Sequence, residues 1–192
     1  LNCILYDAEN KLSELFAIIN EKQLSDELNK KAEERKSLIN KYLLTDKGIY
    51  LDYNFINNNH SSLITVASLY PYAFRISNDK TSAKKVFDLL KEQYGLATSI
   101  KVEKGMQWDH PSMWPPTIYF AYLALKNVGL ISEAKWVIDS YINIVDKVYN
   151  KTNKLWEKYN VLTGDIFHSF EYETPTMLGW TAGIYSYFIK KR

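Results

Sequence analysis

The 192-residue chain has one cysteine, Cys3, which excludes a disulfide within this stretch and leaves its compartment open between cytoplasm and periplasm. Its 24 basic and 22 acidic residues nearly cancel, so it lacks the strongly basic surface of nucleic-acid and membrane-surface proteins. We find no apolar run as long as a membrane span and no signal peptide. These absences predict a soluble protein with neither nucleic acid nor membrane among its partners.

The chain also lacks any internal repeat of fixed period, which disfavours a helical-repeat solenoid. What it does have is an apolar content of 46%, enough for one domain over residues 1–192. Aromatic residues make up 15% and include 15 tyrosines and 5 tryptophans. Aromatic side chains occur both in hydrophobic cores and in binding sites. Their positions along the chain distinguish these two roles.

Apolar residues recur at every third or fourth position in seven segments, which predicts seven amphipathic helices. We expect these helices at about residues 1–19, 25–44, 63–76, 79–95, 116–129, 132–149 and 178–192. Ser25, and either Asn78 or Asp79, are suitable N-caps. Pro71 should kink the third helix, and Pro116 suits the first turn of the fifth. Strand signal is confined to a few residues, mainly residues 48–53.

Short and long connections alternate between the expected helices. The first, third and fifth helices are followed by only a few residues, whereas residues 45–62, 97–115 and 150–177 form long connections. Short links make antiparallel neighbours, so the three long loops must emerge at the same end of the stack. The sequence therefore predicts an all-α array of antiparallel helical hairpins with long functional loops on one face.

Most of the tryptophans lie in these loops or at the start of the last helix, namely Trp108, Trp114, Trp156 and Trp180. A tryptophan ring can stack on the apolar face of a sugar while nearby carboxylates and amides bind its hydroxyls. Hydrolysis of a glycosidic bond with inversion needs two carboxyl groups about 6.5–9.5 Å apart. From composition alone, a sugar site and simple packing at the end of the stack both remain open.

The segment QWDHPSMWPP at residues 107–116 resembles a signature of the trehalase family, commonly QWDxPxGWAP. Four further segments resemble family motifs in the same order. They are LN at residues 1–2, GIYLDY at 48–53, EKY at 157–159, and EY at 171–172 followed by GWTAG at 179–183. Five ordered matches at compatible spacing are much more specific than any one of them.

This resemblance implies the C-terminal part of an (α/α)6 toroid that hydrolyses α,α-trehalose to glucose with inversion and without a cofactor or metal. It implies that Glu157 is the general base that activates water. It also implies that Gln107, Trp108, Asp109 and Glu171 line the sugar subsites. The general acid and an arginine-bearing signature would belong to the N-terminal remainder of the same polypeptide, which is the expected partner besides the sugar.

The chain departs from the family pattern around the expected lid over the sugar. The usual glycine and alanine of the QWD signature are Met113 and Pro115, and DIFHS at residues 165–169 replaces a glycine-rich run. The usual glutamine and asparagine near the C-terminus are Pro175 and Ala182. An α-glucosidase-like enzyme acting on another glycan stays open, as does a non-catalytic carbohydrate-binding or helical interaction module.

Several of these residues also have a simpler interpretation. Asp109 could cap the fifth helix or hold its own loop through an Asx turn. Trp114 is expected to be a packing plug, and Asp52 and Tyr53 should fasten the first loop. Each long loop contains one histidine, but the spacing is not that of a zinc site, so we expect no metal.

Seven helices are fewer than a six-hairpin toroid requires, so faces meant to pack on further helices should be apolar and exposed. We therefore predict that the isolated chain releases no glucose from trehalose and tends to self-associate or to depend on an N-terminal partner. An assay of glucose release with the isolated chain tests this prediction. Robust turnover would refute it.

Overall fold

Helices dominate the computed structural model of the protein, which describes residues 1–101, 104–176 and 179–192. They are α1 (Asn2–Ile18), α2 (Lys22–Leu43), α3 (Tyr70–Ala73), α4 (Lys80–Leu90), α5 (Pro115–Asn127), α6 (Ile131–Thr152) and α7 (Gly179–Ile189), with a 3-10 turn, η1 (Val66–Leu69), before α3. Seven two-residue strands of the described chain lie in the connections: β1 (Tyr53–Asn54), β2 (Asn59–His60), β3 (Lys91–Glu92), β4 (Gly95–Leu96), β5 (Ser112–Met113), β6 (Tyr159–Asn160) and β7 (Asp165–Ile166). The all-α class and the order of the predicted helices are confirmed.

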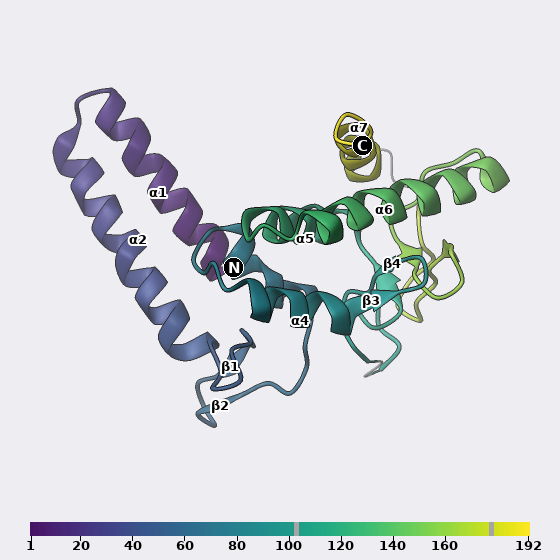
Figure 1. Ribbon diagram of the computed structural model, residues 1–192, viewed down its shortest axis with the longest axis horizontal. Helices are drawn as coiled ribbons and strands as arrows, with labels where there is room; N and C mark the ends of the chain where they lie inside the picture. The colour runs from purple at the N-terminus through teal and green to yellow at the C-terminus, as the bar shows by residue number, and fades with distance from the viewer. Residues whose placement is uncertain (102–103, 177–178) are drawn as a thin grey trace.

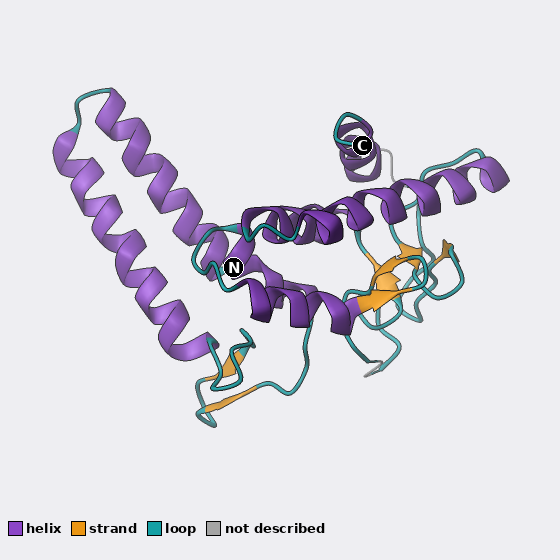
Figure 2. Cartoon of the chain, in the orientation of Figure 1, coloured by secondary structure: helices purple, strands orange, loops and turns teal. Residues whose placement is uncertain are grey.

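The helices are arranged as hairpins in chain order. α1 and α2 run side by side and extend away from the body that contains α4, α5 and α6 (Figure 1). The links after α1, α3 and α5 are short, and those after α2, α4 and α6 are long, as predicted. The strands in the long connections lie on one side of α5 and α6, the lower side of the view in Figure 2. The expected alternation of links thus places the irregular segments together.

The local sequence explains where α4 and α5 begin. Asp79 Oδ1 accepts the backbone N–H groups of Thr81 and Ser82 at 2.9 and 3.1 Å, so one of the two predicted caps is correct. Pro115 and Pro116 occupy the first turn of α5, where a backbone N–H has no helical partner in any case. Both helices therefore begin at residues that suit a helix N-terminus, where the first backbone N–H groups have no acceptor within the helix.

The predicted cap of the second helix is wrong, because α2 begins at Lys22 and not at Ser25. Asn20 takes a left-handed conformation with φ of 63°, which reverses the chain within three residues of the end of α1. Ser25 therefore lies inside α2. Its carbonyl oxygen accepts a hydrogen bond from the Ser13 hydroxyl at 2.8 Å and ties the two helices together.

The predicted third and fourth helices are too long. Pro71 does not kink a long helix; it stands in the first turn of α3, after η1 has been capped by Thr65. α4 ends at Leu90, and the residues expected to extend it to Gly95 turn back as the antiparallel β3–β4 hairpin. The strands of the second and third long loops were not predicted. The expected start of the last helix, residue 178, lies outside the described residues.

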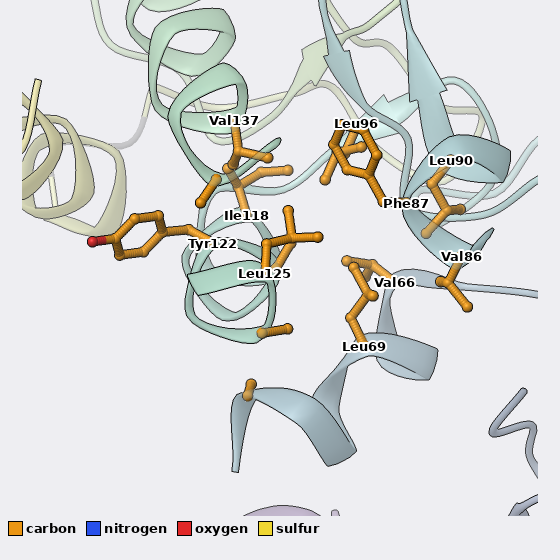
Figure 3. Packing of buried hydrophobic residues seen from close by; sticks show 14 of the residues in the cluster. Val66, Leu69, Val86, Phe87, Leu90, Leu96, Ile118, Tyr122, Leu125 and Val137 are labelled. Atoms are coloured by element: carbon orange, nitrogen blue, oxygen red, sulfur yellow. The ribbon is translucent and has the colours of Figure 1, made fainter. Parts of the chain in front are cut away.

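The core lies between α4, α5, α6 and η1. Figure 3 shows side chains from these elements pointing toward one another, including Phe87 and Leu90 of α4 and Ile118 and Leu125 of α5. Burying each such side chain contributes about 1.5–3 kcal/mol before conformational entropy is subtracted. Val66 and Leu69 of η1 belong to the same core, which so fixes the end of the first long loop.

α1 has an apolar face that is turned to solvent. Ile4, Leu12, Leu15 and Ile18 are all exposed and recur at helical spacing. Such a face is what the sequence predicts for a surface that packs on further helices. None of the described helices combines the length and the apolarity needed to cross a membrane.

Buried tyrosines should make the fold sensitive to alkali. Burial raises the pKa of Tyr159, whose side chain is completely buried, to about 12. The unfolded chain loses this proton near pH 10, so the native state binds more protons between about pH 10 and 12. The free energy of unfolding should therefore fall as pH rises through that window, by roughly 3 kcal/mol for this residue.

The variant Tyr159→Phe tests this expectation by denaturant unfolding between pH 8 and 12. It should show a shallower loss of stability above pH 10 than the unmodified chain. The variant also loses, at every pH, the 3.3 Å hydrogen bond from the Trp156 N–H to the phenol oxygen. The stability difference at pH 8 measures this constant cost and is subtracted from the whole curve. Parallel curves above pH 10 would contradict the expectation.

Candidate functional site

The three long loops are joined to one another by backbone hydrogen bonds. The first loop meets the second where Thr65 bridges Ser99, and there the Val66 N–H donates to the Thr98 carbonyl at 2.8 Å. The second meets the third in an antiparallel sheet with the order β5–β6–β7. The predicted convergence of the loops at one rim is therefore present in the structure.

Gln107 and Glu171 connect the second and third loops directly. The Gln107 backbone N–H donates to Glu171 Oε2 at 2.5 Å, and its side-chain Nε2 lies 3.5 Å from Oε1. The Gln107 carbonyl accepts the indole N–H of Trp114 at 2.9 Å. Glu171 thus holds the backbone of the QWD segment, while the Gln107 side chain lies half-buried between the loops.

Glu157 is buried, with 8% of its surface exposed. Its backbone N–H donates to the Pro175 carbonyl at 3.1 Å, and Trp156 before it is held by the Thr181 hydroxyl of α7 at 2.7 Å. On the side chain, Oε2 accepts hydrogen bonds from Lys158 Nζ at 2.8 Å and from the Tyr172 hydroxyl at 2.5 Å. Both the backbone and the carboxylate of this residue are fixed.

Tyr172 links Glu157 to Gln107. Its hydroxyl lies 2.5 Å from Glu157 Oε2 and 2.8 Å from Gln107 Oε1, so both residues contact the same phenol. Because a phenol has one proton, it donates to one oxygen at a time, and the bond to a carboxylate is the stronger. Burial, the hydrogen bond to Glu157 and the charges of Glu157 and Glu171 raise the pKa of Tyr172. The phenol therefore remains a donor at neutral and moderately alkaline pH.

Lys158 has no solvent-exposed surface. Its ammonium lies 2.8 Å from Glu157 Oε2, 3.8 Å from the centre of the Tyr172 ring and 4.9 Å from that of Trp114. A buried ammonium is costly unless it is paired, and contact with a desolvated aromatic face is worth about 2 kcal/mol. Sequence reasoning gave no role to Lys158 or Tyr172, although both stand inside the EKY and EY motifs.

Three tryptophans form a wall beside these residues. Trp108 stacks on Trp114 with ring centres 3.9 Å apart and planes inclined by 13°, and Trp114 meets Trp180 edge to face at 5.6 Å. Trp114 is 2% exposed, in agreement with its predicted role as a plug. Trp108 is 47% exposed and is therefore accessible to a ligand.

Asp109 is buried and holds its own loop. Its Oδ2 accepts the backbone N–H groups of Lys104 and Met106, both at 2.9 Å. It does not cap α5, whose N-cap is Trp114 without a side-chain hydrogen bond. Of the predicted alternatives, the loop-holding role is the one that the hydrogen bonds support.

Two cavities lie near the first long loop, and one of them reaches the wall of tryptophans. One of about 300 Å³ is lined by Trp108, Asp109 and Tyr70. A neighbouring cavity of about 270 Å³ is lined by Asn2, Asp52 and also Tyr70. The two cavities adjoin each other, because both are lined by Leu63, Thr65, Ala67 and Tyr70. Glu157 lines neither cavity.

The first loop is fastened by aromatic contacts rather than by a carboxylate. The ring of Tyr53 packs on Tyr42 at 5.5 Å and on His60 at 5.4 Å. The side chain of Asp52 is exposed, and its carbonyl accepts the Ser61 N–H at 2.7 Å. In the described part of the chain, no three histidine, cysteine or acidic side chains gather as metal ligands would.

An all-α array of hairpins with an aromatic and carboxylate site at its loop rim defines the chain as part of an (α/α)6 toroid. The chain belongs to the trehalase family, because the model of that family, described as "Trehalase", matches residues 1–192. The predicted resemblance is thereby confirmed.

Relatives at the sequence level include the periplasmic trehalases of Salmonella agona and Salmonella schwarzengrund. They are 32% and 33% identical to the chain over 189 and 190 residues, which is 96% of the chain in each case. The chain spans about a third of the length of these curated relatives, 33% for each.

Solved structures with the same fold include the neutral trehalase of Saccharomyces cerevisiae, with a TM-score of 0.80 at 20% identity. That match covers 100% of this chain and 37% of the yeast chain. The GH63 mannosylglycerate hydrolase of Thermus thermophilus matches with a TM-score of 0.75 at 14% identity, over 100% of this chain and 46% of that one. At these identities the likeness shows the fold, and it confirms the toroid architecture.

The loop-holding role of Asp109 can be tested with Asp109→Ala. The change removes the charged acceptor that two backbone N–H groups share, and a hydrogen bond to a charged group contributes about 1.5–3 kcal/mol. We expect faster amide hydrogen exchange at Lys104 and Met106 than in the unmodified chain. Asp88→Ala, which removes an exposed carboxylate paired with Lys84 on α4, serves as the control. Unchanged protection at both amides would show that Asp109 does not hold the loop.

Proposed function

We propose that the chain supplies part of the active site of an inverting glycoside hydrolase that converts α,α-trehalose to two molecules of glucose. In this proposal Glu157 is the general base. The observation that carries it is the linkage of buried Glu157, through Tyr172, to Gln107 beside the exposed ring of Trp108. The relatives are periplasmic trehalases, which supports trehalose as substrate and the periplasm as compartment.

The subsite residues take different roles in this proposal. Trp108 offers a ring on which a glucose can stack, and the Gln107 amide can hydrogen-bond a sugar hydroxyl. Asp109 and Glu171 act mainly through the backbone amides that they hold, which shape the QWD segment. The side chain of Glu171 is also exposed, so its carboxylate can accept sugar hydroxyls.

The reaction needs a second carboxyl group, which we place on residues outside this chain. Glu157 would take a proton from water while the water oxygen attacks the anomeric carbon. The acid would protonate the leaving oxygen as the glycosidic bond breaks, from a distance of about 6.5–9.5 Å. The span of about a third of the relatives supports an N-terminal remainder of the same polypeptide as the source of this acid.

A second candidate is hydrolysis of another α-glucoside, and it rests on the loop that replaces the usual glycine-rich run. Phe167 is buried, its carbonyl accepts the Thr174 hydroxyl at 2.5 Å, and Phe170 packs over Gly105 while staying 92% exposed. An anchored, aromatic loop at the rim would favour a different second sugar. Release of glucose from a panel of α-glucosides would separate the candidates by their relative kcat/KM values.

The general-base role of Glu157 predicts the outcome of Glu157→Gln in the full-length polypeptide. The amide cannot accept the proton of water, so kcat should fall by about 10²–10⁴-fold, while the Kd for trehalose changes little. Glu173→Gln, an exposed glutamate on the same loop, is the matched control and should retain activity. A non-catalytic binding module would show no turnover in either the unmodified protein or the variant. Full turnover in Glu157→Gln would exclude this residue as the base.

A further inference from the structure

The two oxygens of the Glu157 carboxylate have different surroundings. Oε2 accepts hydrogen bonds from Lys158 Nζ at 2.8 Å and from the Tyr172 hydroxyl at 2.5 Å. Within residues 1–101, 104–176 and 179–192, no hydrogen bond reaches Oε1. A carboxylate can accept about four hydrogen bonds, so Oε1 keeps its full capacity for another donor. The protein has made the two oxygens chemically distinct.

The two donors to Oε2 also hold each other. The Lys158 ammonium lies 3.8 Å from the centre of the Tyr172 ring, with the ring of Trp114 on another side at 4.9 Å. The Tyr172 hydroxyl also contacts Gln107, whose Oε1 lies 2.8 Å from it. The cation and the phenol therefore form one unit, and neither can move far without disturbing the other.

Stability alone does not account for this unit. Replacing a buried ion pair with well-packed apolar residues is often neutral or stabilising, so a core position does not need a lysine. The ammonium nevertheless has no exposed surface and its sequence neighbour is its ionic partner. A carboxylate that must present one oxygen in a fixed direction does need such donors on its other oxygen.

We propose that Lys158 and Tyr172 are positioning residues that hold Oε2 of Glu157, so that Oε1 is the atom that receives the proton of the attacking water. This inference rests on the proposed role of Glu157 as general base. In the step, one O–H bond of water breaks as its proton moves to Oε1. The water oxygen forms the new bond to the anomeric carbon, and the departing sugar oxygen takes a proton from the acid outside this chain.

The variant Tyr172→Phe in the full-length polypeptide tests the phenol, because it removes one hydroxyl and leaves the ring over Lys158. A misplacement of the base by about 1 Å costs about 10²-fold in rate. We therefore expect kcat for trehalose to fall by about 10- to 100-fold. Tyr185→Phe is the matched control, since Tyr185 also donates to a carboxylate, Asp146 Oδ1 at 2.6 Å, but between α7 and α6. It should leave kcat unchanged.

Binding is measured separately in the Glu157→Gln background, which isolates affinity from turnover. Adding Tyr172→Phe there should change the Kd of trehalose by less than about twofold, because a positioning residue does not touch the sugar. A large rise in Kd would make Tyr172 a substrate-binding residue and overturn the inference. Equal kcat values for Tyr172→Phe and Tyr185→Phe would also overturn it.

Lys158→Met provides a second route if one variant folds poorly, and circular dichroism reports the folding of each. Since both residues act on Oε2, the double variant should lose less in kcat than the product of the single losses. Fully multiplicative losses would mean that the two residues act independently and would overturn the shared role. Turnover by Glu157→Gln itself would instead refute the proposed function, so the two failures are distinguishable.

Discussion

The pairing of β5 with β6 is the constraint on which the rest of the site depends. Met113 lies opposite Tyr159 and Ser112 opposite Asn160, so the second and third long loops share a ladder of backbone bonds. This ladder sets the distance between the QWD segment and the EKY segment, which are about fifty residues apart in sequence. Side chains beyond the ladder can then meet across the two loops, as Gln107 and Tyr172 do.

A second consequence of this ladder is that charge can be buried next to it. Lys158 and Glu157 both lie away from solvent, and each is satisfied by the other and by aromatic rings or a phenol. Removing a charge from water is tolerable only where its partners are already in place. The loops can hold such partners because the helical core between α4, α5 and α6 fixes where each loop leaves and returns (Figure 1).

Much of this fold could be predicted, and the errors have identifiable physical causes. Long amphipathic patterns such as those of α1 and α6 give helices, because each turn repeats the same apolar face. The end of α4 was predicted too late, since no stop signal precedes Gly95 and residues 91–96 form a hairpin that is also bonded to the third loop. There the Tyr94 N–H donates to the Val161 carbonyl at 2.9 Å. Tertiary pairing overrides local preference at such places.

The sequence by itself determined the family, the order of the helices and the convergence of the long loops, because motif spacing and link length are properties of the chain alone. Only the tertiary structure decided what each polar group does. It assigned Asp109 to backbone amides, gave Glu171 the same kind of task, and brought Lys158 and Tyr172 onto one oxygen of Glu157. Such assignments depend on which polar atoms lie about 3 Å apart once the loops have folded, which a local sequence pattern does not encode.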